Sequence, residues 1–159
     1  MDATVVSAER VIGAPPEPIF DLLADASRHV ELDGSGQLRG VASGAPERLA
    51  LGASIGMSMH MGVGYSMVNT VIEFEENRCI AWQSKLAGRW GTLLGGRIWR
   101  YQLEPVRSGT LVRESWDISR DHQRLFLRHH KVVEATRANM GRTLDRIGEL
   151  VAPASPASS

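Results

Sequence analysis

The sequence predicts an α+β fold in which a curved antiparallel sheet of about six or seven strands wraps around one long C-terminal helix. Strand-like segments separated by turn residues follow one another from about residue 37 to residue 118. After Ser119 the spacing of the apolar residues changes to that of an amphipathic helix. An antiparallel sheet with one apolar face must have that face covered, and this last segment is the only large apolar partner in the sequence.

Two short helices are expected between the first strand and the rest of the sheet. Residues 3–12 are rich in β-branched side chains and predict a strand. Pro16 suits the first turn of a helix, on which Ile19 and Leu22 then share one face. A second short helix is expected over about residues 25–32. We expect these two helices to close one end of the wrapped sheet.

The middle of the chain predicts an antiparallel meander. Its strand-like segments are separated by turn residues such as Glu76-Asn77. The expected strands cover residues 37–43, 51–62, 65–75 and 78–84, and a final hairpin covers residues 95–118. A glycine-rich loop at residues 88–96 precedes this hairpin, and we interpret it either as a mobile lid or as a packed or dimer-contact loop.

The C-terminal segment, residues 121–151, predicts one long amphipathic helix or two helices with an early break. Its apolar stripe includes Leu125, Phe126, Val132, Val133, Met140, Leu144, Ile147 and Val151. Residues 152–159 are small, polar and interrupted by proline, so we expect a disordered tail there. The rest of the chain, residues 1–151, has the size of a single domain.

The composition argues against several classes of protein. Eighteen basic and eighteen acidic residues balance, and no basic block stands out, which disfavours a nucleic acid or an acidic membrane as the partner. No apolar run approaches the length of roughly 20 residues that a membrane span requires. Cys79 is the only cysteine, and none of the five histidines has the spacing of a metal motif. We therefore expect a cytoplasmic protein without a metal or another cofactor, present as a monomer or a homodimer.

The hairpin of residues 95–118 contains the strongest candidate site. Large side chains share one face of its two strands, and they are Trp99, Tyr101, Leu103, Val112, Glu114 and Trp116. Depending on the register, Tyr101 lies opposite Val112 or Glu114. An unpaired buried carboxylate would cost several kcal/mol or take up a proton. Glu114 is therefore either a polar group that orients a ligand hydroxyl or carbonyl in an apolar pocket, or a residue near an open end of the sheet or paired with Arg97.

Further candidates for contact with a ligand come from other segments. Met57 and Met59 alternate along the strand of residues 51–62, and methionine suits either a pliable pocket wall or a plain core. Trp82 is a candidate in the next hairpin. His129 and Val133 lie in or near the C-terminal apolar stripe, from which they can reach a pocket between helix and sheet.

Four stretches of the chain have the composition and order of elements in a known superfamily. They are VIGAPPEPIFDLLAD, VIEFEENRCIAWQ, WRYQLEPVRSGTLVRESWDIS and a helix that ends MGRTLDRIGELV. Together they resemble the START and pollen-allergen superfamily, also called SRPBCC, and are most similar to its bacterial polyketide cyclase/dehydrase-like proteins. The resemblance implies the helix-grip fold, with a deep cavity for an apolar ligand between the sheet and the C-terminal helix. It also implies, from aromatase/cyclase relatives, that Arg97 and Tyr101 could shape a poly-keto chain.

Three functions are consistent with these observations, because members of this superfamily include carriers, enzymes and receptors. The first is binding of a hydrophobic small molecule, lipid-like or polyketide-like, without chemistry. The second is a polyketide cyclase or dehydratase, in which Tyr101, Glu114, Arg97 or His129 moves protons. The third is a protein-interaction or regulatory module of the same fold. The sequence has no recognisable catalytic set, so we favour the first.

Overall fold

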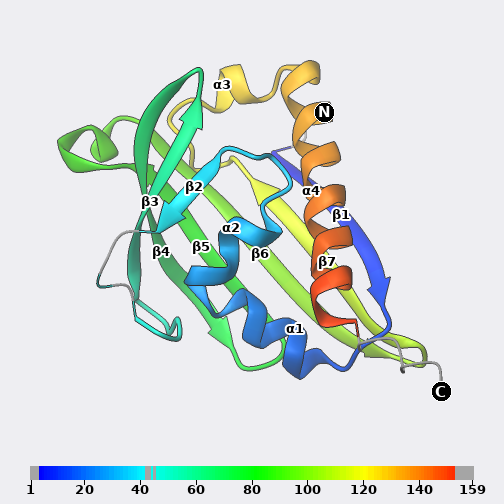
Figure 1. Cartoon of the computed structure of the whole chain (residues 1–159). Coiled ribbons are helices and arrows are strands. Elements are labelled where there is room, and N and C mark those ends of the chain that lie inside the picture. Colours follow the sequence, from blue (N-terminus) through cyan, green and yellow to red (C-terminus); the bar gives the residue numbers. More distant parts are fainter. Residues whose placement is uncertain (1–3, 42–43, 45, 153–159) are drawn as a thin grey trace.

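A bent antiparallel sheet of seven strands forms the frame of the molecule, and one long helix lies across its concave side (Figure 1). The computed structural model describes residues 4–41, 44 and 46–152. The strands are β1 (Val5–Ile12), β2 (Leu38–Val41), β3 (Ser54–Met61), β4 (Val63–Glu75), β5 (Cys79–Leu86), β6 (Gly95–Val106) and β7 (Gly109–Asp117). The helices are α1 (Pro16–Leu23), α2 (His29–Leu32), α3 (Arg124–Leu127) and α4 (His130–Val151), with short 3-10 helices η1 (Ala26–Arg28) and η2 (Gly88–Thr92). The strand order is β1-β7-β6-β5-β4-β3-β2, so the predicted α+β fold class is confirmed.

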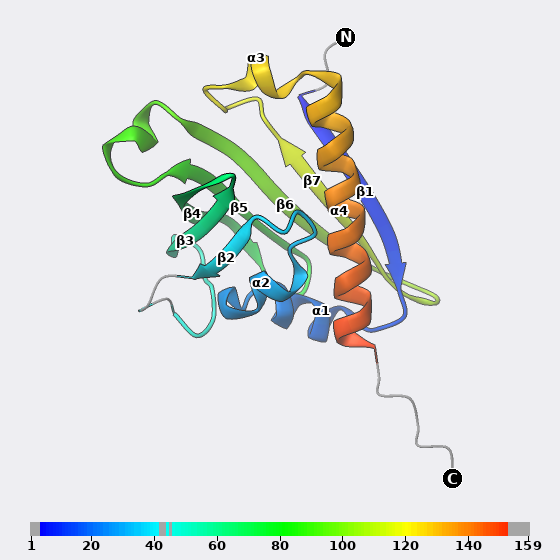
Figure 2. The same cartoon turned by 45° about the horizontal axis from the view of Figure 1, so that its top comes forward.

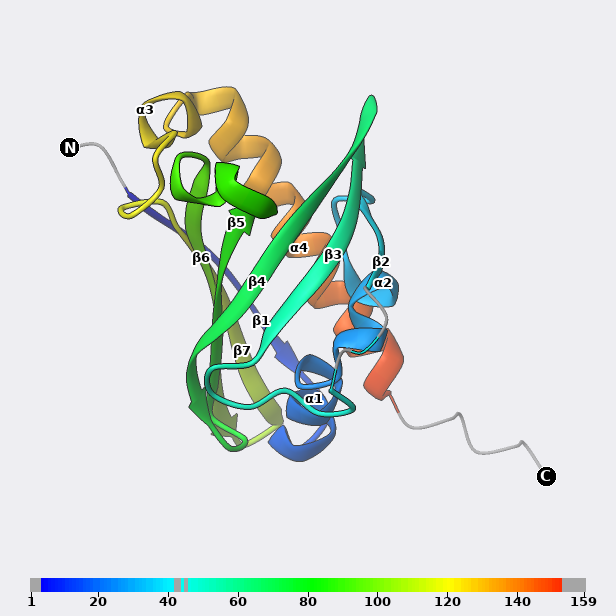
Figure 3. The ribbon, with the colours of Figure 1, turned by 90° about the vertical axis from the view of Figure 1, so that its left-hand side faces the viewer.

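Irregular strand pairing helps to bend the sheet. The register shifts between Val71 and Glu73 on β4, and again between Ser84 and Lys85 on β5. An extra residue on one strand of a pair bends that strand and increases its twist. The part of the sheet formed by β2, β3 and β4 therefore curls round to the side on which α4 lies (Figure 3).

Two clusters of buried side chains hold the sheet and the helices together. The larger cluster surrounds α1 and α2 and includes Ile19, Phe20, Leu23, Leu32, Ile55, Val71, Ile80, Tyr101, Val112, Leu144 and Ile147. The smaller cluster joins β7 to the C-terminal helices and consists of Val6, Trp116, Ile118, Leu127 and Met140. Helix α4 packs mainly against β1, and it also contacts α1 and α2 (Figure 2). The short helices thus close one end of the wrap, as the sequence predicts.

The C-terminal segment forms two helices, α3 and α4, and the chain changes direction between them at Arg128 and His129. The early break was one of the two predicted possibilities, and it changes the role of the residues before it. Leu125 and Phe126 do not continue the apolar stripe of α4 and are exposed, whereas Leu127 is buried. The apolar residues of a helix stay on one face only as long as the helix is uninterrupted. The break between α3 and α4 therefore leaves Leu125 and Phe126 off the buried face of α4.

The C-terminal tail and a membrane-spanning helix were the subjects of two further predictions from the sequence. The expected disordered tail of residues 152–159 lies outside the described residues, apart from Ala152. Within the described ranges, none of the helices has both the length and the apolar character needed to cross a membrane.

The turn before β2 is held tightly against α4 at Gly34. The backbone N–H of Gly34 donates to Thr143 Oγ1 at 2.9 Å, and its carbonyl accepts from Arg142 Nε at 3.0 Å. A Cβ atom added at Gly34 would lie 2.2 Å from the backbone oxygen of Asn139 and 2.7 Å from the backbone nitrogen of Thr143. Only glycine therefore allows this contact between the N-terminal segment and the long helix.

Replacing this glycine is expected to loosen the closed end of the wrap. Gly34→Ala should lower the free energy of unfolding by about 1–3 kcal/mol, because the added methyl group collides with helix backbone. Urea unfolding followed by circular dichroism measures the change. Gly13→Ala is the matched control, since an added Cβ there meets nothing within 4 Å, and it should change stability by less than about 0.5 kcal/mol. Equal stabilities for the two variants would contradict this role of Gly34.

Candidate functional site

The pairing of β6 with β7 places four large side chains side by side on the concave face of the sheet. Trp99 lies opposite Trp116, and Tyr101 lies opposite Glu114. Leu103 and Val112 form the next pair on the same face, so the register is the second of the two that the sequence left open. Directly opposite residues on one face are close enough for their side chains to interact.

Glu114 is buried and bound to Tyr101. Only 3% of Glu114 is exposed, and Tyr101 donates its hydroxyl proton to Glu114 Oε1 at 2.7 Å. Burial raises the pKa of Glu114 to about 8, with a further contribution from the charge of Asp33, although the hydrogen bond from Tyr101 acts in the opposite direction. Burial, and then the adjacent Glu114, raise the pKa of Tyr101 well above its ordinary value. At neutral pH this pair is therefore a neutral carboxylic acid beside a neutral phenol.

Two buried polar atoms of this face lack a hydrogen-bond partner among the described residues. They are Glu114 Oε2 and Trp116 Nε1. Both side chains belong to β7 and are two residues apart, so both lie on the concave face. Leaving a buried donor or acceptor unsatisfied costs about 1–3 kcal/mol, and most such groups in proteins have a partner. A molecule bound on this face, or water, would satisfy them.

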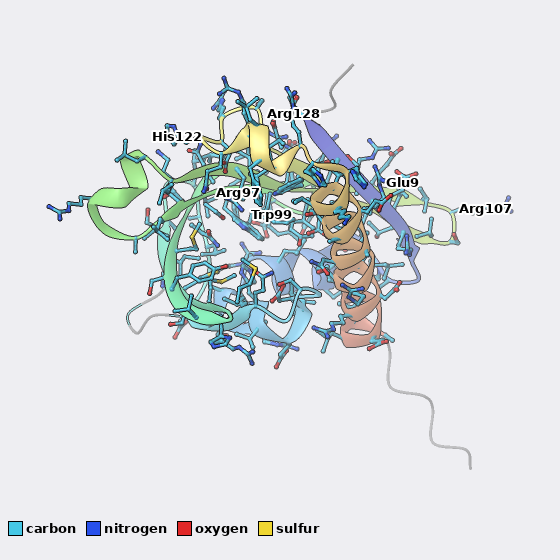
Figure 4. The ribbon with its side chains drawn as sticks, turned by 90° about the horizontal axis from the view of Figure 1, so that it is seen from above. Glu9, Arg97, Trp99, Arg107, His122 and Arg128 are labelled. Carbon is cyan, nitrogen blue, oxygen red and sulfur yellow. The ribbon has the colours of Figure 1, made fainter. Side chains whose placement is uncertain are left out.

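Part of this face is accessible to solvent at Trp99. Its ring lies 6.2 Å from that of Trp116 between centroids. Unlike Trp116, Trp99 is only partly buried, and Val132 and Val133 at the start of α4 are partly buried in the same cluster. Figure 4 looks along the wrap from the end at which α3 lies and shows Trp99 beside Arg97. We refer to this end, opposite α1 and α2, as the open end.

Arg97 is committed to a structural ion pair. Asp121 is fully buried and accepts hydrogen bonds from the backbone N–H of Arg97 at 3.0 Å and from its Nε at 2.9 Å. The adjacent Gly96 has a φ of +115°, and an added Cβ would lie 2.4 Å from the backbone oxygen of Arg120. These contacts fix the segment that follows β7 against the start of β6. Arg97 therefore does not pair with Glu114, although the sequence allowed that pairing.

The methionines and the histidine proposed from the sequence occupy different positions. Met57 is buried, whereas Met59 is only partly buried. Both belong to β3, in the curled part of the sheet. His129 is exposed at the start of α4, where its Nδ1 accepts from the backbone N–H of Lys131 at 3.4 Å. The structure thus places His129 on the surface, apart from Tyr101 and Glu114.

A second polar cluster on the concave face was missed by the sequence analysis. Ser84 Oγ donates to Asn69 Oδ1 at 2.5 Å, and Asn69 Nδ2 lies 2.9 Å from the sulfur of Met57. Asn69 and Ser84 are both buried and lie opposite each other on β4 and β5. The sequence offered one signal. Asn69 is two residues before Val71 in the same strand, so both side chains point to the same face of the sheet.

His29, also missed, covers Trp82. The two rings are stacked with 5.0 Å between centroids, and His29 Nε2 lies 2.8 Å from the carbonyl oxygen of Leu23. Burial lowers the pKa of His29, so the ring is neutral at neutral pH and donates its N–H to that carbonyl. Trp82 also contacts Tyr101, at 5.5 Å between ring centroids, so His29, Trp82, Tyr101 and Glu114 form a continuous series of contacts. No sequence motif marks the histidine in this role.

A surface groove of about 380 Å³ lies elsewhere, between β1 and α4. It is lined by Arg10, Glu134, Arg137, Ala138, Gly141, Arg142 and Asp145. Its lining contains neither Glu114 nor Trp116 and is largely charged, so we do not place the site of an apolar ligand there. In the part of the chain that the structure describes, no group of three or more histidine, cysteine, aspartate and glutamate side chains could hold a metal ion.

The buried acid predicts a specific pH dependence of stability. Glu114 changes its pKa from an ordinary value of 4.5 to about 8 on folding. Between these pH values the unfolded chain has released the proton while the folded protein retains it, so stability falls as the pH rises. Glu114→Gln should remove this loss, which amounts to roughly 1.4 kcal/mol per pH unit.

Urea unfolding of the wild type and the variant from pH 5 to pH 8 measures this effect. The difference between the two proteins is the informative quantity, because His29 contributes an opposite trend to both: its lowered pKa stabilises the folded state as the pH rises toward 6.5. Glu104→Gln, an exposed glutamate on β6, is the matched control and should leave the slope unchanged. Parallel curves for wild type and Glu114→Gln would show that Glu114 is ionised in the folded protein.

Comparison with known proteins supports the fold but not an activity. No protein-family model matches the sequence. The uncharacterized protein Rv0088 of Mycobacterium tuberculosis is 34% identical over 86 residues, which are 54% of this chain and 38% of that protein. The match thus spans less than two fifths of the relative's length.

Solved structures share the arrangement of more than nine tenths of this chain. The Polyketide_cyc-like protein Cgl2372 of Corynebacterium glutamicum superimposes with a TM-score of 0.59 at 23% identity, covering 93% of this chain and 91% of its own. The major latex-like protein 151 of Panax ginseng superimposes with a TM-score of 0.66 at 11% identity, covering 94% and 97%. These neighbours confirm the predicted helix-grip fold.

Proposed function

We propose that this chain, which has the helix-grip fold of the polyketide cyclase-like and pollen-allergen proteins, binds a neutral, largely apolar small molecule between the concave face of the sheet and α4. The ligand would carry at least one carbonyl or hydroxyl oxygen. The observation that carries the proposal is the pair of buried polar atoms, Glu114 Oε2 and Trp116 Nε1, that lack a partner among the described residues.

The chemistry of the two atoms favours an oxygen acceptor on the ligand. An indole N–H can only donate, and Glu114 retains its proton at neutral pH because burial raises its pKa to about 8. Since Tyr101 already donates to Oε1, Oε2 is the oxygen that can carry the proton and donate it. Two donors on an apolar face suit a ketone, enone, ester or alcohol oxygen.

The apolar part of the ligand would contact the aromatic and aliphatic side chains around these donors. Trp99, Val132 and Val133 are partly buried next to Trp116, so additional apolar contact would remove their surface from water. Met59 offers a similar partly buried surface from β3. A ligand carboxylate is disfavoured because no described cation contacts Glu114, and its charge would be buried beside two acids, Glu114 and Asp33.

One observation favours catalysis as a second candidate function. A carboxylic acid whose pKa is about 8 can give a proton to a ligand carbonyl oxygen near neutral pH. Such a proton transfer would assist ring closure or dehydration of a poly-keto compound. In this case Glu114→Gln would abolish turnover while binding remained, because glutamine still donates a hydrogen bond but cannot transfer a proton.

A matched pair of ligands tests the binding proposal. A long-chain 2-ketone should bind about 5–10-fold more tightly than the alkane of the same length, because only the ketone satisfies the buried donors. Quenching of tryptophan fluorescence, with native mass spectrometry to establish stoichiometry, measures both affinities. Glu114→Leu and Trp116→Phe should each reduce this preference, and Glu104→Leu should preserve it. Thermal unfolding verifies that each variant is folded.

Equal affinity of the wild type for ketone and alkane would reject the role of the two donors. Failure to bind either compound, or a wider panel of fatty alcohols, sterols and aromatic ketones, would reject apolar ligand binding altogether. It would then favour the interaction-module function.

A further inference from the structure

Exposed apolar side chains from three separate segments lie at the open end of the molecule. They are Met61 and Val63 at the β3–β4 turn, Leu93 in the loop between β5 and β6, and Leu125 and Phe126 on α3, and each is between 60% and 74% exposed. Figures 1 and 3, which differ by a quarter turn, both show these three segments at the same end. We call these five side chains the apolar rim.

The fold presents this rim instead of burying it. Leu127 anchors α3 in the cluster that contains Trp116 and Met140. With Leu127 buried, the adjacent Leu125 and Phe126 point outward on the short helix. Single exposed apolar residues are ordinary, but five large ones on three segments at one end of a protein favour an interaction surface there.

Charge is distributed unevenly between the open end and the rest of the chain. Residues 60–66, 85–97 and 119–131 bear the rim and contain seven basic residues and one acidic residue, Asp121, a net charge of +6. Because the whole chain is neutral, the remaining residues have a net charge of −6. Asp121 is itself buried against Arg97, and the bordering Asp117 and Glu134 still leave a clear excess of positive charge. The balanced composition therefore conceals a basic open end.

We propose that the open end docks on the surface of an anionic lipid bilayer, with the apolar rim inserted among the lipids and the surrounding basic residues on the headgroups. Exposed Leu and Phe side chains flanked by Arg and Lys are the combination that binds such an interface, through burial of apolar surface and attraction to anionic lipid. A second copy of the chain fits this surface less well, because a two-fold contact would oppose two ends of net charge +6.

Docking in this orientation would place the open end of the concave face next to the lipid. Trp99 lies on that face toward the open end and is partly exposed. A hydrophobic ligand would then pass between bilayer and protein without crossing water. The docking surface itself does not depend on the ligand, since none of the five rim residues contributes a donor to the Glu114 and Trp116 pair.

Flotation with lipid vesicles tests the docking surface. The wild-type protein should float with vesicles that contain phosphatidylglycerol and remain behind with vesicles of phosphatidylcholine alone, and added salt should weaken the association. The double variant Leu125→Gln/Phe126→Gln should bind the vesicles at least roughly tenfold more weakly than the wild type, because it loses the apolar part of the contact. The double variant Arg124→Gln/Lys131→Gln should bind more weakly and with less dependence on salt.

Leu51→Gln and Arg107→Gln are the matched controls, since both residues are exposed and lie outside the rim segments. Arg107 belongs to the β6–β7 turn. Both should float as the wild type does. Equal partition of the wild type between anionic and neutral vesicles, or unchanged binding of Leu125→Gln/Phe126→Gln, would overturn the proposal. Concentration-dependent self-association without lipid that this double variant abolishes would also overturn it, in favour of a dimer.

The same variants separate this inference from the proposed function. Ligand affinity in the absence of vesicles should be unaffected by Leu125→Gln/Phe126→Gln. Conversely, Glu114→Leu should change ligand preference while vesicle binding stays at the wild-type level.

Discussion

The register between β6 and β7 is the constraint on which both the core and the candidate site depend. It sets Tyr101 opposite Glu114 and Trp99 opposite Trp116, all on the concave face. Because successive side chains of a strand alternate between faces, moving either strand by one residue would turn its whole set outward. The buried cluster around Trp116 would then be lost, together with the hydrogen bond that holds the carboxyl group of Glu114. Packing and site are thus specified by the same pairing.

A buried glutamic acid makes the core less stable than an apolar residue would. An apolar residue of similar size would avoid both the desolvation of the carboxyl group and its unpartnered oxygen. The protein instead keeps the acid, pairs one oxygen with Tyr101, and leaves the other on the concave face beside Trp116. Features that oppose stability in this way are concentrated at functional sites, where a ligand supplies the missing interaction. This is why we place the proposed site here and not in the charged groove along β1.

The open end brings together apolar and basic residues that are distant in the sequence. The β3–β4 turn, the loop before β6 and the segment after β7 each bring a few apolar or basic residues, and none forms a recognisable motif alone. The ion pair of Arg97 with buried Asp121 fixes the last of these segments on the sheet, next to the partly exposed Trp99. Access to the concave face and the proposed contact with lipid therefore share one structural support, while they use different side chains.

The sequence by itself determined the order of the elements, the α+β class and the faces of the strands, because hydrophobic periodicity and turn residues act over short distances along the chain. It also supplied most of the aromatic residues on the concave face, and it named Tyr101 and Glu114 as a possible pair. Only the tertiary structure decided that this pair forms, that Arg97 binds Asp121 instead, and that His129 lies on the surface. It alone brought Asn69 to Ser84 and His29 to Trp82. It also broke the C-terminal helix so that Leu125 and Phe126 became exposed, and it gathered six net positive charges at one end of a neutral chain. These outcomes depend on strand register, on helix direction and on contacts between residues far apart in sequence, which local patterns do not encode.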